Sequence, residues 1–434
     1  MKIKTLTLRY IFTVIILTSF LIPEIIAQTS NGWRGPARDG IFRETGLLKS
    51  WPETGPELLW ETTDAGKGYS APVIAGNCIY LTGMNEAEDK ETFVAFSLSD
   101  GKKIYEVEYG NPWALTFPDT RTTPTIADGK AYAISGSGEI ACINITDGKI
   151  VWTVDGGKDF KRLTGNWGTA ESPLVYDNKV IYTPAGEETT MIALDTQTGE
   201  VVWKTKPFGD IGAYLSPILI NYKGKRQIIG STSIHLIGVN PDTGEIEWAF
   251  EDWGSPPEPL PAAAVQGNTM SVNVAANTPL FVDGFLFFSH ADVGAYKLKL
   301  NDKLTDVSLV WNTDSLGTDL GGYVLVDGTI YGSNFLDQYR GDWVALDWNT
   351  GELKYRYNWE TKSKGPIVAA DGMLYCYDER RGFLALVKPN PEKFDIVSEF
   401  RITKGEGPHW SHPVINDGIM YIRHGSALLA YKIK

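Results

Sequence analysis

Two charged side chains stand where a loop would meet a short apolar strand, and both could bind a ligand. Glu171 directly precedes Ser172-Pro173, and we place Arg121 at the matching position about 50 residues earlier. The Glu171 carboxylate could ligate a hard cation or accept a hydrogen bond from a sugar hydroxyl. A solvated or ion-paired loop carboxylate is the alternative. Arg121 could hold an anionic group, or it could pair structurally with Asp119 or another acidic residue.

Histidines and neighbouring acids form a second candidate set. His409 and His412 have a His-x-x-His spacing that could bind a metal ion if further ligands came from elsewhere. His290 is two residues from Asp292, a pairing typical of a general base and its partner, although a hydrogen-bonded surface histidine is the alternative. Asp319 lies in another irregular connection. We therefore expect these five residues near a common mouth.

Four tryptophans fall outside the regular pattern described below, namely Trp113, Trp167, Trp253 and Trp410. Aromatic rings at the mouth of a channel could stack on sugar rings or on a planar cofactor. Alternatively, they could pack beneath the long loops.

A repeated unit must position all of these residues. Its clearest copies start at Pro124, Pro173 and Pro217. Each has a short apolar strand, a tight turn, two further strands, and a closing run in which Trp follows Gly by four residues, as in Gly199 to Trp203. Four strands at a period of roughly 45 to 50 residues are typical of a β-propeller blade. We therefore predict an all-β fold, an eight-bladed β-propeller of four-stranded antiparallel blades.

The ends of the repeat array indicate how the ring closes. The eighth unit, His412 to Tyr431, has room for only three strands, whereas Leu58-Leu59-Trp60-Glu61 resembles a lone fourth strand. We predict that this N-terminal strand completes the last blade, which removes open sheet edges. The propeller then covers 57–434, and 28–56 forms an N-terminal cap segment. Trp152, Trp203, Trp248 and Trp311 are expected to pack between blades.

Residues 1–27 have the pattern of a cleavable secretory signal peptide. A positive start, Lys2 to Arg9, precedes an apolar stretch, and Ala27 offers a cleavage point. An uncleaved anchor is the alternative. We expect a periplasmic or secreted protein that is a monomer and not an integral membrane protein. The net charge of −13 argues against a nucleic-acid partner.

The repeat units resemble the quinoprotein-like, or PQQ-like, β-propeller repeat. The matching segments include 193–203 and 345–352, and the resemblance covers nearly all of residues 57–433. This superfamily includes PQQ-dependent alcohol and sugar dehydrogenases and the propeller lipoprotein of the outer-membrane β-barrel assembly machinery. The segment 33–40, Trp-Arg-Gly-Pro-Ala-Arg-Asp-Gly, is similar to the N-terminal signature of a large bacterial branch of the superfamily.

The resemblance implies two functions. One is a binding or scaffold protein whose long-loop face engages a protein or a polysaccharide. The other is an oxidoreductase that uses PQQ and Ca²⁺ on an alcohol or a sugar, as in extracellular polysaccharide breakdown. Its cofactor contacts would be Arg121, Trp167 and Glu171, and Glu171 would also be the candidate metal ligand. The dehydrogenases carry an adjacent Cys-Cys pair, and this chain, with Cys78, Cys142 and Cys376, has none. We favour the scaffold.

Overall fold

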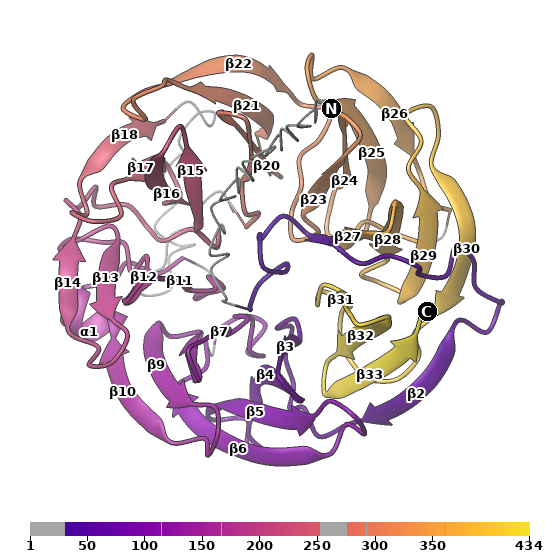
Figure 1. The fold of residues 1–434 in the computed structure, drawn as a ribbon, viewed down its shortest axis with the longest axis horizontal. Helices are drawn as coiled ribbons and strands as arrows, with labels where there is room; N and C mark the ends of the chain where they lie inside the picture. The colour runs from indigo at the N-terminus through magenta and orange to yellow at the C-terminus, as the bar shows by residue number, and fades with distance from the viewer. Residues whose placement is uncertain (1–30, 114, 166, 252–275, 292, 361) are drawn as a thin grey trace, which may run out of the picture.

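The computed structural model is an eight-bladed ring of four-stranded antiparallel sheets around one central axis (Figure 1). It describes residues 31–113, 115–165, 167–251, 276–291, 293–360 and 362–434. The predicted signal peptide, Asp292 and Trp253 lie outside these residues. The predicted fold class and blade count are confirmed.

In every blade the first strand is innermost and the fourth forms the rim. Blade 1 consists of β3 (Val73–Ala75), β4 (Cys78–Met84), β5 (Glu91–Ser97) and β6 (Lys103–Gly110), and blade 2 of β7 (Thr125–Ala127), β8 (Lys130–Ile134), β9 (Glu139–Asn144) and β10 (Ile150–Asp155). Blade 3 consists of β11 (Leu174–Tyr176), β12 (Lys179–Tyr182), β13 (Ile192–Asp195) and β14 (Val201–Lys204), and blade 4 of β15 (Ile218–Tyr222), β16 (Lys225–Ser231), β17 (Leu236–Val239) and β18 (Ile246–Phe250). A short helix, α1 (Gly156–Phe160), follows blade 2.

Blades 5 to 8 continue the same order. Blade 5 consists of β19 (Leu280–Val282), β20 (Phe285–His290), β21 (Gly294–Leu300) and β22 (Val307–Thr313), and blade 6 of β23 (Tyr323–Val326), β24 (Thr329–Phe335), β25 (Gly341–Asp347) and β26 (Leu353–Tyr357). Blade 7 consists of β27 (Ile367–Ala370), β28 (Met373–Tyr377), β29 (Phe383–Lys388) and β30 (Asp395–Arg401), and blade 8 of β31 (Val414–Asn416), β32 (Ile419–His424) and β33 (Ala427–Lys432) with β2 (Glu57–Thr62).

The ring closes as the sequence predicts. β2 pairs antiparallel with β33, so that Leu58 lies opposite Tyr431. A second N-terminal strand, β1 (Ile41–Phe42), adds to the inner edge of blade 7 by parallel pairing with β27. Both ends of the chain therefore contribute to the closing blades.

At several junctions of the ring, the repeated aromatic residue packs against a glycine of the next blade. A Cβ on Gly199 of blade 3 would lie 2.7 Å from the Trp152 ring of blade 2, and Gly244 meets Trp203 in the same way. Trp152 Nε1 also donates to Thr196 O of blade 3 at 3.2 Å. Only glycine allows this close approach at a positive φ. The predicted inter-blade packing of these tryptophans is confirmed.

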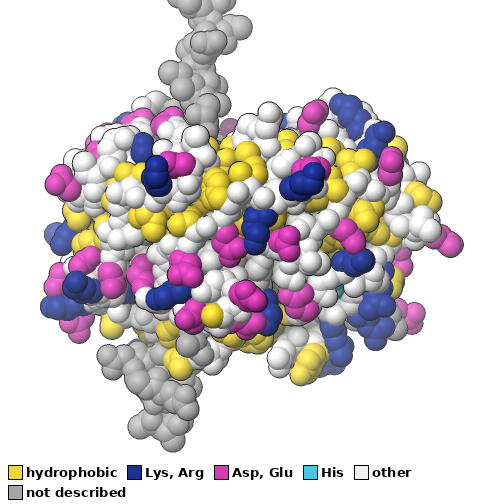
Figure 2. Space-filling model, turned by 90° about the horizontal axis from the view of Figure 1, so that it is seen from below, with side chains coloured by type: hydrophobic (Ala, Val, Ile, Leu, Met, Phe, Trp, Pro, Cys, Tyr) yellow, Lys and Arg dark blue, Asp and Glu magenta, His cyan; other side chains and the backbone are white. Residues whose placement is uncertain are grey.

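A β-bulge interrupts the rim strand of each blade at the residue before this aromatic position. In blade 2, for example, Ile150 pairs with Ile143 and Trp152 with Cys142, which leaves Val151 unpaired. Figure 2 views the rim from the side of β6 and β10, where hydrophobic side chains are visible among the charged ones. Ile104, Ile150 and Val151 are the exposed hydrophobic residues of these two strands. Bulges twist an edge strand, which hinders pairing with another chain.

The two faces of the ring differ. On one face, turns such as Asp128-Gly129 and Asp371-Gly372 have both residues at positive φ, as tight hairpins require. We call this the turn face. The opposite face carries the second-to-third-strand loops and the connections between blades, and we call it the long-loop face. Those predicted site residues that the structure describes lie on the long-loop side.

Candidate functional site

The centre of the ring is occupied by the protein's own N-terminal segment, Trp33–Gly40, drawn in indigo in Figure 1. Arg38 is buried, and its guanidinium donates to Ser172 O at 3.1 Å, to Pro217 O at 3.0 Å and to Pro173 O. It also donates to Thr125 Oγ1 at 3.3 Å. One side chain therefore joins the inner strands of blades 2, 3 and 4.

Arg34 makes the equivalent contacts on the other side of the axis. It donates to Ile367 O at 3.2 Å, to Tyr323 O and to His412 Nδ1 at 3.1 Å, which links blades 6, 7 and 8. Trp33 donates to Thr278 Oγ1 of blade 5 at 2.9 Å, and its ring packs on that of His412. Asn31 contacts blades 1 and 2, so the stretch from Asn31 to Gly40 reaches all eight blades.

Burial dominates the electrostatics of this centre. Desolvation lowers the pKa of Arg34 and of Arg38 to about 10, so both remain charged at neutral pH. Desolvation and the Arg34 charge lower the pKa of His412 to about 3. His412 is therefore neutral, with Nδ1 accepting from Arg34 and Nε2 donating to Leu320 O at 3.1 Å.

Glu171 is buried within its own blade rather than presented to solvent. Its carboxylate accepts from the Thr183 backbone N–H and from Thr183 Oγ1, each at 3.2 Å. Burial raises its pKa to about 8, opposed by Thr183 and by the charges of Arg38 and Arg162. The side chain thus faces internal partners, including the cation of the N-terminal segment.

Arg121 does not hold the position in blade 2 that Glu171 holds in blade 3. Glu171 lies two residues before Pro173, and the residue two before Pro124 in blade 2 is Thr122, which follows Arg121. The Arg121 guanidinium donates to three main-chain carbonyls, those of Thr116, Phe117 and Trp167. The expected pairing with Asp119 is replaced, because Asp119 accepts from the Tyr69 hydroxyl at 3.0 Å. Arg121 therefore ties two loops together.

The aromatic candidates pack among the loops of the long-loop face. Trp410 contacts Tyr69 and Phe117, with ring centroids 4.8 and 5.1 Å away. Trp167 contacts Tyr214 edge-on, and Trp113 Nε1 donates to Thr116 Oγ1 at 3.2 Å. All three tryptophans are half-buried.

The structure separates the two histidines of the His-x-x-His pair. His409 stacks on His424 at a centroid distance of 3.5 Å and hydrogen-bonds through Nδ1 to the Tyr377 hydroxyl, whereas His412 faces Arg34. Burial lowers the pKa of His409 to about 3. His290 is buried at the end of β20.

The described part of the chain brings no three His, Cys, Asp or Glu side chains together in a way that could hold a metal ion. Asp319 is half-buried, and its charge contributes to the raised pKa of Glu379. The candidate residues are thus distributed over several blades.

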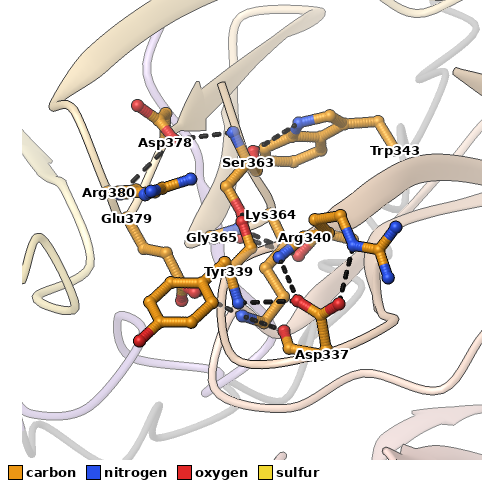
Figure 3. Close-up of polar contacts among 11 residues, drawn as sticks. Asp337, Tyr339, Arg340, Trp343, Ser363, Lys364, Gly365, Asp378, Glu379 and Arg380 are labelled. Atoms are coloured by element: carbon orange, nitrogen blue, oxygen red, sulfur yellow. Dashed lines mark hydrogen bonds and ion pairs between the residues drawn. The ribbon is translucent and has the colours of Figure 1, made fainter. Parts of the chain in front are cut away.

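Sequence reasoning missed a buried ion pair between blade 7 residues Lys364 and Glu379 (Figure 3). Burial raises the pKa of Glu379 to about 7, and Lys364 opposes this rise. Lys364 stands two residues before Pro366, the place that Glu171 occupies before Pro173. Comparing this repeat position among the blades would have identified it.

A second buried carboxyl, Glu91 of blade 1, was also missed. It accepts from the Tyr109 hydroxyl at 2.7 Å and from Gly136 N at 2.9 Å, and burial raises its pKa to about 8. A carboxyl at the first residue of a strand gives no periodic signal, so the sequence alone did not distinguish it.

Comparison with known proteins places this geometry in a family. The family described as outer membrane protein assembly factor BamB matches residues 42–154 and 111–334. The chain belongs to this BamB-like family of PQQ-repeat propellers. A BamB from Alkalilimnicola ehrlichii is 24% identical over 184 residues, which are 42% of each chain, so the match spans less than half of that relative.

Solved structures of BamB-like and related propellers share the fold. BamB from Moraxella catarrhalis has a TM-score of 0.59 at 14% identity, covering 87% of this chain and 99% of its own. A europium-containing methanol dehydrogenase has a TM-score of 0.61 at 14% identity, covering 90% and 88%. At this level of identity the likeness concerns the fold alone.

The centre of this BamB-like propeller does not fit PQQ with a hard cation. Arg34, Arg38 and Trp33 fill the axis, and the polar groups of Arg121 and Glu171 have partners within the protein. A cavity of about 410 Å³ remains beside the segment on the turn face, but residues such as Ile218, Leu280 and Val282 make its wall largely apolar. A cation site needs several converging oxygen ligands, but the side chains of this wall offer only Asp39, which is paired with Arg43, and the amide of Asn221.

No helix among the described residues has the length and apolar character needed to cross a bilayer. The three cysteines are free thiols, and Cys142 and Cys376 are buried.

Proposed function

We propose that this protein is an exported scaffold that binds a protein partner through its long-loop face. The observation that carries the proposal is the filled axis: the position where a propeller could hold a central ligand is occupied by Arg34, Arg38 and Trp33 of the chain itself. A partner would therefore bind at the outer surface of the ring. The matching family is described as an outer membrane protein assembly factor, which supports a role in protein assembly.

The composition of the long-loop face also supports this role. Exposed apolar side chains occur there on loops of several blades, at Leu115, Phe117, Phe208, Leu336 and Tyr339. Aromatic and aliphatic side chains on loops, held by a rigid ring, are typical of binding surfaces. The exposed aliphatic residues of the rim lie instead along the bulged strands.

We further propose residues 1–27 as the signal peptide and the periplasm or the exterior as the destination. Residues 28–56 would then be an N-terminal cap segment that includes the axis-filling Trp33–Gly40, and the closing strand β2 follows it. A polysaccharide remains the alternative partner at the same face.

Site-specific photo-crosslinking in the producing cell tests the scaffold proposal. A photoreactive amino acid would replace Leu115, Phe208 or Leu336 on the long-loop face, or Lys225 on the turn face as the control. We expect one recurrent protein adduct from the long-loop positions and none from Lys225. Adducts of equal yield from both faces, or none from either, would contradict the proposal.

A further inference from the structure

One part of the long-loop face concentrates positive charge beside exposed apolar groups. We call it the arginine patch; it consists of Leu336, Tyr339, Arg380, Arg381 and Arg401. All five side chains are exposed. They come from the second-to-third-strand loops of blades 6 and 7 and from the end of β30. The chain as a whole carries a net charge of −13, so a cationic area is a local exception.

Contacts between its members make the patch continuous. The Arg380 guanidinium lies 5.2 Å from the centroid of the Tyr339 ring, an arrangement typical of a cation–π interaction. Arg401 Nε donates to Arg381 O at 2.9 Å, which brings the rim strand against the loop of blade 7. Leu336 and Tyr339 belong to one loop, closed by a hydrogen bond from Leu336 N to Arg340 O.

The acidic residues of the two loops that carry the patch are already engaged. Asp378 is buried and accepts from the backbone N–H groups of Ser363, Arg380 and Arg381. Glu379 is buried against Lys364, and Asp337 pairs with Arg340 at 2.6 Å (Figure 3). Within the described residues, Arg380, Arg381 and Arg401 have no carboxylate within ion-pair distance.

The buried Lys364–Glu379 pair holds the loop beneath this exposed surface in place. Glu379 N donates to Lys364 O at 3.0 Å, and His409 N donates to Glu379 O at 2.8 Å. The loop that carries Arg380 and Arg381 is thus bonded to the connections on both sides. Preorganised side chains lose less conformational entropy on binding.

We infer that the arginine patch binds an acidic polypeptide segment of the partner, one in which Asp or Glu residues alternate with apolar residues. Guanidinium groups bind carboxylates in paired hydrogen bonds, and Leu336 with Tyr339 offers the apolar contact that a peptide side chain would cover. This inference rests on the proposed function and names the chemistry of the partner.

Fluorescence anisotropy with defined probes tests the inference. The probe is a labelled 12-residue peptide of alternating Glu and Leu; comparison peptides carry Lys for Glu or Ser for Leu. The triple variant Arg380→Glu, Arg381→Glu, Arg401→Glu is matched by a control of equal charge change, Lys225→Glu, Lys299→Glu, Lys303→Glu, at exposed positions remote from the patch. We expect the triple patch variant to weaken binding at least tenfold and the control to leave it within twofold.

Several outcomes would overturn the inference. They are equal binding of the Glu and Lys peptides, equal loss in both triple variants, or tighter binding of polygalacturonate or phosphatidylglycerol vesicles through the same arginines. The crosslinking experiment separates this failure from that of the proposed function. If the adduct at Leu115 persists in the triple patch variant while the peptide fails to bind, the scaffold stands and the acidic partner does not.

Discussion

Arg34 donates a hydrogen bond to Nδ1 of His412 across 3.1 Å, joining residues 378 positions apart in the sequence. This contact connects the N-terminal segment to the first residues of the last blade. Together with the contacts of Arg38 on the opposite side of the axis, it makes the segment a central strut of the ring.

Replacing Arg38 should strongly destabilise the ring. Arg38→Ala removes four hydrogen bonds. Ser172 O and Pro217 O lose their bond from Arg38, whereas Pro173 O keeps the bond from the Thr125 hydroxyl. We expect a loss of about 3 kcal/mol in the free energy of unfolding, measured by denaturant titration. Arg43→Ala is the control, because that side chain is 64% exposed in its ion pair with Asp39 and should cost under about 0.5 kcal/mol. Equal losses of unfolding free energy in Arg38→Ala and Arg43→Ala would show that Arg38 does not stabilise the ring.

The glycine that faces the neighbouring tryptophan should tolerate no side chain. Gly199 (φ 75°) would place a Cβ 2.7 Å from the Trp152 ring, whereas Gly129 (φ 73°) has nothing within 4 Å of a Cβ. Both alanine substitutions carry the strain of a positive φ, about 1 kcal/mol. We expect Gly199→Ala to cost about 2 kcal/mol more than Gly129→Ala. Similar melting temperatures would show that blade packing does not depend on this contact.

Glu91 should make the protein less stable as pH rises. Its folded pKa of about 8 exceeds the ordinary value of 4.5, so between these values the folded state holds a proton that the unfolded state releases. Stability therefore falls from pH 4.5 to pH 8. Glu91→Gln should remove this dependence. The free energy of unfolding of the variant, relative to that of the parent, should therefore be higher at pH 8 than at pH 5 by on the order of 2 kcal/mol. The exposed Glu200→Gln serves as control; parallel pH profiles for the two variants would contradict the assignment.

His412, unlike Glu91, should make the protein less stable as the pH falls into the acid range. Because its folded pKa is about 3 and its ordinary value is 6.5, the folded state resists protonation, and stability falls as pH drops from 6.5 toward 3. His412→Asn should lose about 1 kcal/mol at pH 7, since the contacts to Arg34 and Leu320 weaken. Its stability should then decline less steeply in acid than that of the parent. An unchanged slope in acid denaturation would rule out this role.

The fold was largely predictable because its signals are local and repeated. Turn glycines and the aromatic spacing predict the blades, and Leu58–Glu61 predicts the closing strand. The filling of the axis was not predictable, because Arg34 and Arg38 occur once and their partners lie in distant blades. Arg121 was misaligned by one residue, and Lys364 was overlooked although it shares the repeat position of Glu171. Ligand binding by Arg121, Trp167 and Glu171 remains a prediction.

The central claim is that Trp33–Gly40 fills the axis and that the protein works through its long-loop face. Isothermal titration of the purified protein with PQQ in the presence of Ca²⁺ tests it most directly. We predict no saturable binding up to high micromolar PQQ. One-to-one binding, accompanied by dye reduction with an alcohol or a sugar, would contradict the claim.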